Sequence, residues 1–159
     1  MTKLSSAKIG GMPAPAQDLP FLLLAAAAEV TDAIHEGVVA AGFGDIRPTH
    51  GFAFVRMAPN GATVVEIAEH LGVTKQAASQ LVDELVKKGY AERNSHPHDA
   101  RARLITLTER GWACTRAADA AAARFAERWA STLGGGGVAE LRNLLAQVVT
   151  PGRVRPSIR

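Results

Sequence analysis

The chain has one cysteine, few aromatic residues and no apolar run long enough to cross a membrane. Cys114 is the single cysteine among 159 residues, which excludes an intrachain disulfide framework and any all-cysteine metal site within one chain. Aromatic residues account for 5% of the sequence, whereas 47% of the residues are apolar and 21% are charged. This composition is typical of a helix-rich globular protein and excludes a fibrous or disordered chain.

Basic charge is concentrated at the two ends of the chain. Five of the 18 basic residues lie in residues 1–17 and 150–159, which leaves 13 basic against 15 acidic residues between these segments. The net charge of +3 is therefore weak evidence for a nucleic-acid partner. The two end segments lack any apolar periodicity, so we expect a flexible amino-terminal arm over 1–17 and a flexible basic tail over 150–159.

The apolar run Leu19–Ala28 follows two lysines and so resembles the core of a secretory signal. The alternative is a helix with Asp18 as its N-cap and Pro20 in its first turn. Apolar residues continue beyond the run at helical spacing as far as Val38, which favours the helix. We therefore expect a helix over about 18–41, a cytoplasmic and reducing location, and no membrane partner.

Turn-forming residues and changes of periodicity divide the rest of the chain into short elements. Apolar spacing of 3.6 residues predicts helices, and alternation with a period of two predicts strands. The resulting order is helix, helix, helix-turn-helix, hairpin, long helix, helix. This order predicts a mostly α fold of the α+β class, a winged helix-turn-helix flanked by long helices. The predicted helices cover about 18–41, 48–57, 63–71, 74–87, 108–133 and 138–149, and the strands cover Tyr90–Asn94 and Ala102–Leu107.

The pair of short helices around Gly72 is the most specific pattern. Thr63 and Glu66 have the spacing of a capping box, and Thr74 can cap the second helix after the break at Gly72. Two short amphipathic helices joined by a tight turn form a helix-turn-helix. The expected buried face of the second helix comprises Ala77, Ala78, Leu81, Val82 and Leu85.

The opposite face of that second helix carries residues suited to the edges of DNA bases. Glutamine pairs with adenine, lysine with guanine, and serine or threonine with several base edges or with phosphate. The following hairpin is locally basic, as a wing that meets the DNA backbone would be. A helix-turn-helix that serves only for packing is the alternative. The predicted contacts to double-stranded DNA are Thr74, Lys75, Gln76, Ser79, Gln80, Arg93, Arg101 and Arg103.

Two segments within residues 63–111 resemble the MarR family of bacterial transcriptional regulators. They are Leu71–Leu85, followed by Gly89-Tyr90 and Arg93, and the wing pattern Asp99-x-Arg101-x-Arg103-x-x-x-Leu107-Thr108-x-x-Gly111. The resemblance implies one domain over 18–149. Its winged helix-turn-helix covers about 49–107, and its dimerisation helices cover about 18–41, 108–133 and 138–149.

The resemblance also implies a function and several residue roles. A homodimer is expected to bind a pseudo-palindromic operator as a repressor and to be released by a small ligand, such as an aromatic acid. Asp99 is expected to pair with an arginine and stabilise the wing, while Arg101 reaches the DNA. His35, Arg47 and His50 lie where relatives form an effector pocket, so we expect ligand contacts there.

Other chemistry is not indicated by the sequence. The segment His96-Pro97-His98-Asp99 lacks a metal-ligand spacing, and no cofactor or metal is expected. No nucleophile–base pair, paired carboxylates or cofactor fingerprint points to an enzyme. Cys114 is expected to be structural. Two alternatives to the DNA-binding regulator remain: a dimeric ligand- or protein-binding module without specific DNA binding, and a cysteine-based redox sensor.

Overall fold

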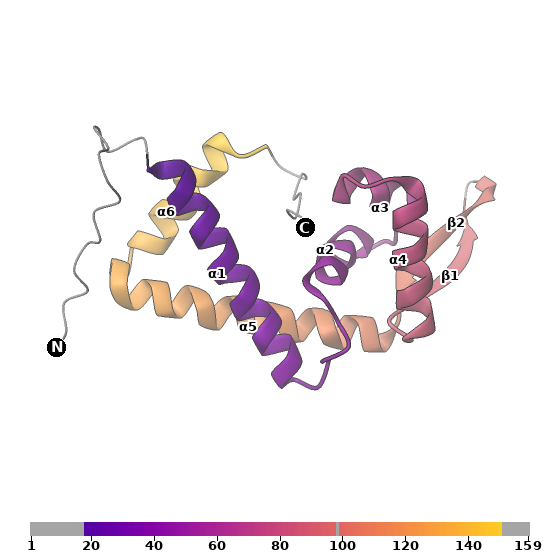
Figure 1. Ribbon diagram of the computed structural model, residues 1–159, viewed down its shortest axis with the longest axis horizontal. Coiled ribbons are helices and arrows are strands. Elements are labelled where there is room, and N and C mark those ends of the chain that lie inside the picture. The colour runs from indigo at the N-terminus through magenta and orange to yellow at the C-terminus, as the bar shows by residue number, and fades with distance from the viewer. Residues whose placement is uncertain (1–17, 98, 151–159) are drawn as a thin grey trace.

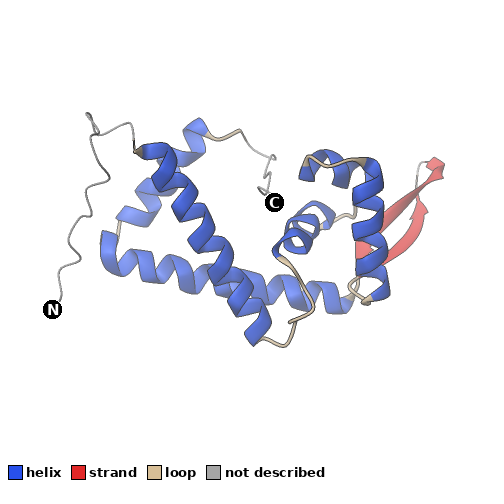
Figure 2. Ribbon diagram, viewed as in Figure 1, coloured by secondary structure: helices blue, strands red, loops and turns tan. Residues whose placement is uncertain are grey.

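The computed structural model describes residues 18–97 and 99–150, without the side chains of residues 99 and 100. The arm and most of the tail expected at the two ends, 1–17 and 151–159, lie outside these residues. The element order matches the prediction (Figures 1 and 2). The elements are α1 (Leu19–Ala40), α2 (Pro48–Met57), α3 (Val64–Leu71), α4 (Lys75–Lys87), β1 (Ala91–His96), β2 (Asp99–Leu107), α5 (Glu109–Leu133) and α6 (Gly137–Val148).

Long helices and a winged unit lie at opposite ends of an elongated molecule (Figure 1). Helix α5 runs along one side and connects the end formed by α2, α3, α4 and the hairpin with the end that carries α6. Helix α1 packs across α5, and the crossing is close because a Cβ added at Gly37 would lie 2.4 Å from the Cβ of Ala121. Within the described ranges, no helix is both long enough and apolar enough to span a membrane.

Three threonines begin the helices of the winged unit, as the sequence predicts. The Oγ1 of Thr63 accepts a hydrogen bond from the backbone N–H of Glu66, and the carboxylate of Glu66 accepts one from the backbone N–H of Thr63. Thr74 and Thr108 accept equivalent bonds at the starts of α4 and α5, at 3.1 and 3.2 Å. Between α3 and α4, Gly72 takes the left-handed backbone conformation with a φ of 68°. The capping box and the helix-turn-helix turn are therefore confirmed.

The hairpin is longer than predicted. Strands β1 and β2 are antiparallel and pair from Ala91 opposite Leu107 to Ser95 opposite Arg103 and beyond. The predicted strands were too short on the side of the turn because the outer residues are mostly polar and show no apolar alternation, although their backbones pair. Two further backbone hydrogen bonds, of 2.8 and 3.0 Å, join Ala62 to Ile105 and attach the hairpin to the start of α3.

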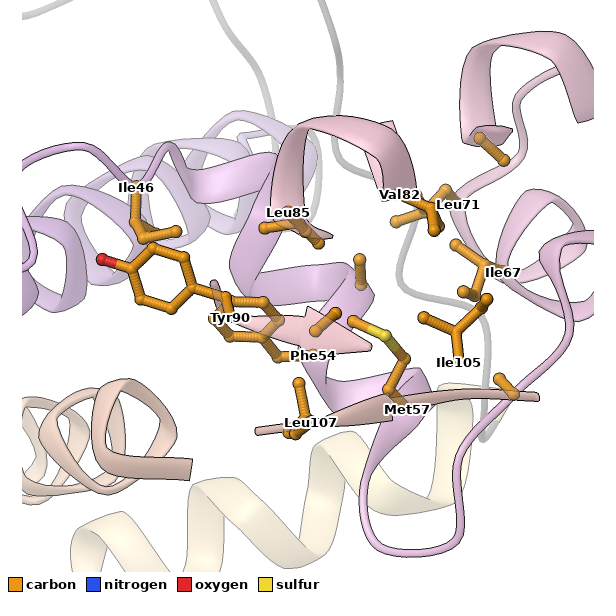
Figure 3. Close-up of a cluster of buried hydrophobic side chains, with 14 of the residues drawn as sticks. Ile46, Phe54, Met57, Ile67, Leu71, Val82, Leu85, Tyr90, Ile105 and Leu107 are labelled. Atoms are coloured by element: carbon orange, nitrogen blue, oxygen red, sulfur yellow. The ribbon is translucent and has the colours of Figure 1, made fainter. Parts of the chain in front are cut away.

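The hydrophobic core lies between α2, α3, α4 and the hairpin (Figure 3). The face predicted to be buried on α4 is partly correct. Ala78, Val82 and Leu85 are fully buried and Leu81 is half-buried, but Ala77 is exposed, because it lies too far round the helix from the core. The largest buried side chains of the core include Phe54, Met57, Ile67, Leu71, Tyr90, Ile105 and Leu107.

Candidate DNA-binding surface and adjoining pocket

The amino-terminal half of α4 presents a polar surface. Four of the predicted contact residues are exposed there, and the fifth, Ser79, is half-buried. The first turn of α4 contains no acidic residue. The surface therefore presents hydroxyl, amide and ammonium groups, and no carboxylate in the first turn of α4 would repel an anionic partner. The four exposed residues are Thr74, Lys75, Gln76 and Gln80.

Two further residues of the predicted contact set are exposed arginines on the hairpin. Arg101 and Arg103 are two residues apart on β2, so they lie on the same face of the strand, and both are exposed. The Nη1 of Arg103 lies 3.4 Å from the Oγ of Ser95 on β1. His98 and the side chain of Asp99 lie outside the described part of the structure. The wing-stabilising role of Asp99 therefore stays a prediction.

Arg93 has a partner that the sequence did not indicate. Its Nη2 donates to Oδ1 of Asp83, so an ion pair joins β1 to α4. Asp83 lies 62% exposed beyond the polar half of α4. The guanidinium of Arg93 neutralises the negative charge of Asp83 at the edge of the polar surface, and the ion pair connects the hairpin to α4.

A second cluster of charges joins α4 to the start of α2. Glu84 in the last turn of α4 accepts hydrogen bonds from Arg47 and, at 2.7 Å, from Lys88. The bond from Lys88, with the charges of His50 and Arg47, holds the pKa of Glu84 below its ordinary value. Nothing in the sequence pointed to Glu84, because its partners Arg47 and His50 lie more than 30 positions away and no local pattern connects them.

His50 is wholly buried beside this cluster. Its Nδ1 accepts a 3.1 Å hydrogen bond from the backbone N–H of Arg47, and its Nε2 lies 3.3 Å from Oε2 of Glu84. An accepting Nδ1 places the proton of a neutral imidazole on Nε2, toward Glu84. Burial lowers the pKa of His50 although Glu84 opposes this effect.

A pocket of about 260 Å³ lies between α1, α2 and α5. Its walls are mainly apolar, and Ile34, Phe52 and Ala118 are among them. Two of the three predicted ligand residues, His35 and Arg47, line the pocket. The third, His50, does not line it, because its ring is turned toward Glu84. The remaining polar lining residues are Thr31, Thr115 and Asp119.

Cys114 also lines the pocket but is 2% exposed. Burial raises the pKa of its thiol to about 11, so the thiol stays protonated at neutral pH. A reactive cysteine needs a thiolate and a cationic environment. This environment fits the structural role expected for Cys114. In residues 18–97 and 99–150, no group of three or more histidine, cysteine, aspartate or glutamate side chains is placed to hold a metal ion.

Part of the chain matches a known protein family. A family model described as MarR family matches residues 52–102, which include α3, α4 and most of the hairpin. No curated protein sequence gives a significant match.

Among solved structures, a MarR-family transcriptional regulator from Rhodococcus sp. RHA1 is 25% identical with a TM-score of 0.69, and the match covers 90% of this chain and 100% of that chain. Apo MarR from E. coli gives 25% identity and a TM-score of 0.69 over 88% of this chain and 100% of its own. CouR from Rhodococcus jostii RHA1, solved with p-coumaroyl-CoA, is 25% identical with a TM-score of 0.68, and the match covers 91% of this chain and 100% of CouR. Residues 52–102 therefore match the MarR family model, and the chain has the winged helix-turn-helix fold of that family's transcriptional regulators.

Proposed function

We propose that the chain is a sequence-specific DNA-binding repressor that binds a pseudo-palindromic operator as a homodimer. The observation that carries this proposal is the exposed polar surface on the first half of α4, the second helix of the helix-turn-helix. In a helix-turn-helix, the second helix enters the major groove with its amino-terminal residues at the base edges. A helix face that is merely solvated more often carries glutamate–lysine pairs.

The individual roles follow from side-chain chemistry. Gln76 and Gln80 can each form two hydrogen bonds to adenine, and Lys75 can donate to guanine. Thr74 and Ser79 can reach base edges or phosphate. Arg101 and Arg103 lie on the wing, where a narrow minor groove or the phosphate backbone attracts guanidinium groups. Arg93 contributes as a positioning residue through Asp83.

A second copy of the chain would cover an exposed apolar surface on the long helices. The first two turns of α1 expose five large apolar side chains, and in α6 no residue is buried. Exposed apolar patches of this extent mark interfaces. We propose that the helices over 18–41, 108–133 and 138–149 form the dimerisation part of a single domain over 18–149. The exposed residues of α1 are Leu19, Phe21, Leu22, Leu23 and Leu24.

The pocket between α1, α2 and α5 is the candidate site for a small-molecule effector. It has mainly apolar walls and a few polar groups, which is the usual chemistry of ligand pockets. CouR, which shares the fold, was solved with p-coumaroyl-CoA. We propose that His35 and Arg47 contact the effector, and that effector binding weakens DNA binding.

Selection of bound sequences from random duplex DNA tests the proposal. Full-length protein of verified oligomeric state is used at near-physiological salt, because phosphate contacts depend strongly on salt. We expect an enriched inverted repeat with half-sites about 10 bp apart, centre to centre. Sequence-blind binding would contradict sequence-specific regulation. No binding even at low salt would favour a ligand- or protein-binding module of the same fold.

A further inference from the structure

We propose that Ala77 is a specificity-determining residue of α4, and that its methyl group contacts the 5-methyl group of a thymine in the major groove of the operator. The inference rests on the proposed function and deepens it, because it names a base that the protein reads without a hydrogen bond. Ala77 is not among the residues predicted to contact DNA, since its apolar side chain predicts a place in the core.

The structure places Ala77 on the polar surface of α4. The environment changes sharply along the first turns of this helix, because Gln76 and Ala77 are exposed whereas Ala78 is fully buried. Gln80 is also exposed. It is three residues from Ala77 and four from Gln76, the spacings at which side chains are neighbours on a helix surface. The methyl group of Ala77 therefore adjoins the glutamines proposed to read the bases.

The first turn of α4 holds Ala77 in a defined position. Its backbone N–H donates a 3.1 Å hydrogen bond to Oγ1 of Thr74, the N-cap of the helix. The Cβ of a helical residue tilts toward the amino end of its helix, and this end of the second helix enters the major groove in a helix-turn-helix. In this binding mode the methyl group faces the base edges, and ordering it costs no side-chain entropy.

A lone methyl group can recognise a single feature of the major groove. It has no donor or acceptor, so it cannot replace the water that hydrates the amino, carbonyl and ring-nitrogen groups of the base edges. The 5-methyl group of thymine is the one apolar group that the four bases present there, and alanine is among the side chains suited to contact it. Cytosine presents an amino group in this groove instead, so the contact favours thymine over cytosine.

The neighbouring glutamines indicate where this thymine lies. Each glutamine can form two hydrogen bonds to an adenine. Side chains that are neighbours on a helix have Cβ atoms about 5–6 Å apart, and successive bases of one DNA strand are about 3.4 Å apart. The thymine that Ala77 contacts should therefore lie within about two base pairs of an adenine bound by Gln80.

A solvated alanine that serves only the helix is the alternative. Alanine has the highest helix propensity, so an exposed alanine needs no partner to be favourable on α4. The two explanations differ in one measurable respect. A contact with thymine makes the affinity for DNA depend on the 5-methyl group of one base, whereas a solvated alanine does not.

Replacement of thymine by deoxyuridine in the selected operator tests the proposal. Uracil pairs with adenine as thymine does and lacks only the 5-methyl group. Each thymine of one half-site is replaced in turn, and the affinity of the full-length protein is measured by fluorescence anisotropy at fixed salt. We expect a position at which the replacement weakens binding about three- to fivefold, the effect of taking one methyl group out of an apolar contact.

Ala77→Gly removes the methyl group from the protein instead of from the DNA. At the identified position, this variant should bind the thymine and uracil operators equally. The ratio of the two affinities is taken within each variant, so a general loss of affinity from a weaker helix cancels. Ala120→Gly is the matched control, because Ala120 is also an exposed helical alanine but lies on α5. It should keep the wild-type ratio.

Thermal melting by circular dichroism shows whether each variant is folded. The uracil scan with the wild type tests the contact even if Ala77→Gly is unstable. Four results would overturn the proposal: an enriched half-site without thymine, no weakening at any uracil position, an undiminished ratio in Ala77→Gly, or a lost ratio in Ala120→Gly. Failure to select any operator would contradict the proposed function as well, whereas an operator indifferent to uracil would contradict this inference alone.

Discussion

The phenol of Tyr90 donates a 2.6 Å hydrogen bond to Oδ1 of Asp45 and joins the start of the wing to the loop before α2. Arg110, at the start of α5, completes this contact. Its Nη2 donates to the Tyr90 oxygen at 3.0 Å, and its Cζ lies 4.4 Å from the centre of the ring. Tyr90 is fully buried, and burial together with the bond to Asp45 raises the pKa of its phenol to about 12. Three segments distant in sequence are thereby fixed relative to one another.

Replacing the Tyr90 hydroxyl measures the strength of this junction. Tyr90→Phe keeps the ring contacts with Phe43 and Phe54 but leaves Asp45 without its phenol donor. We expect the free energy of unfolding to fall by about 1.5–3 kcal/mol, the range for one lost hydrogen bond to a charged group. Urea unfolding followed by circular dichroism measures the change. An unchanged midpoint and slope would show that the hydroxyl contributes nothing to stability.

His50 predicts a dependence of stability on pH. Because burial lowers its pKa below the ordinary value of 6.5, the unfolded chain binds a proton more readily than the folded chain. Stability should therefore decrease as the pH falls from about 7 to about 5. His50→Gln removes the titrating group and should flatten this part of the profile. Urea midpoints across the range test the slope, and an equally steep profile in the variant would contradict the assignment.

Gly111 marks a close approach of α5 to the backbone that leads into the wing. A Cβ added there would lie 2.2 Å from the carbonyl oxygen of Tyr90 and 3.2 Å from the Cβ of Leu107. Gly111→Ala should lower the free energy of unfolding by about 1–3 kcal/mol, because the backbone must shift to relieve the overlap. Gly135→Ala is the control, since its Cβ would meet no atom within 4 Å. Equal melting temperatures of the two variants would contradict the predicted overlap.

Arg101 on the wing is predicted to contact DNA. Arg101→Ala should weaken binding to the selected operator by about 1–3 kcal/mol and leave dimerisation intact. Arg116→Ala removes the same charge from an exposed arginine on α5 that pairs with Glu109, and it should bind nearly as the wild type does. Fluorescence anisotropy at fixed salt compares the two. If both variants bound the operator with equal affinity, Arg101 would contribute only through the net charge of the protein.

The exposed start of α1 is predicted to form the dimer interface. Leu22→Glu would bury a charge in that interface and should weaken dimerisation on the order of a hundredfold. Val65→Glu changes an exposed apolar residue of α3, outside the proposed interface, and should remain dimeric. Analytical ultracentrifugation measures both. If Leu22→Glu dimerised as tightly as the wild type, the start of α1 would not be part of the dimer interface.

Elements marked by signals within one or two turns were predictable. The caps at Thr63, Thr74 and Thr108 each need only a hydroxyl and a backbone N–H three residues later, so the local sequence is enough to predict them. The outer half of the hairpin was underestimated, because its pairing uses backbone groups and leaves no apolar pattern. Ala77 was assigned to the core wrongly. A small apolar residue at the edge of a helix face carries no signal that separates burial from exposure.

By itself, the sequence determined the helix-turn-helix, its polar outer face and the basic hairpin that follows it. Only the tertiary structure decided that Glu84 meets Arg47 across 37 positions and that the ring of His50 turns away from the pocket. It also decided that Tyr90 holds Asp45. Helix caps and apolar periodicity depend on residues within one or two turns of each other, so they can be recognised in the sequence. Contacts between α2 and α4 depend on the angle and distance at which two helices pack, and many side chains of the core set these together.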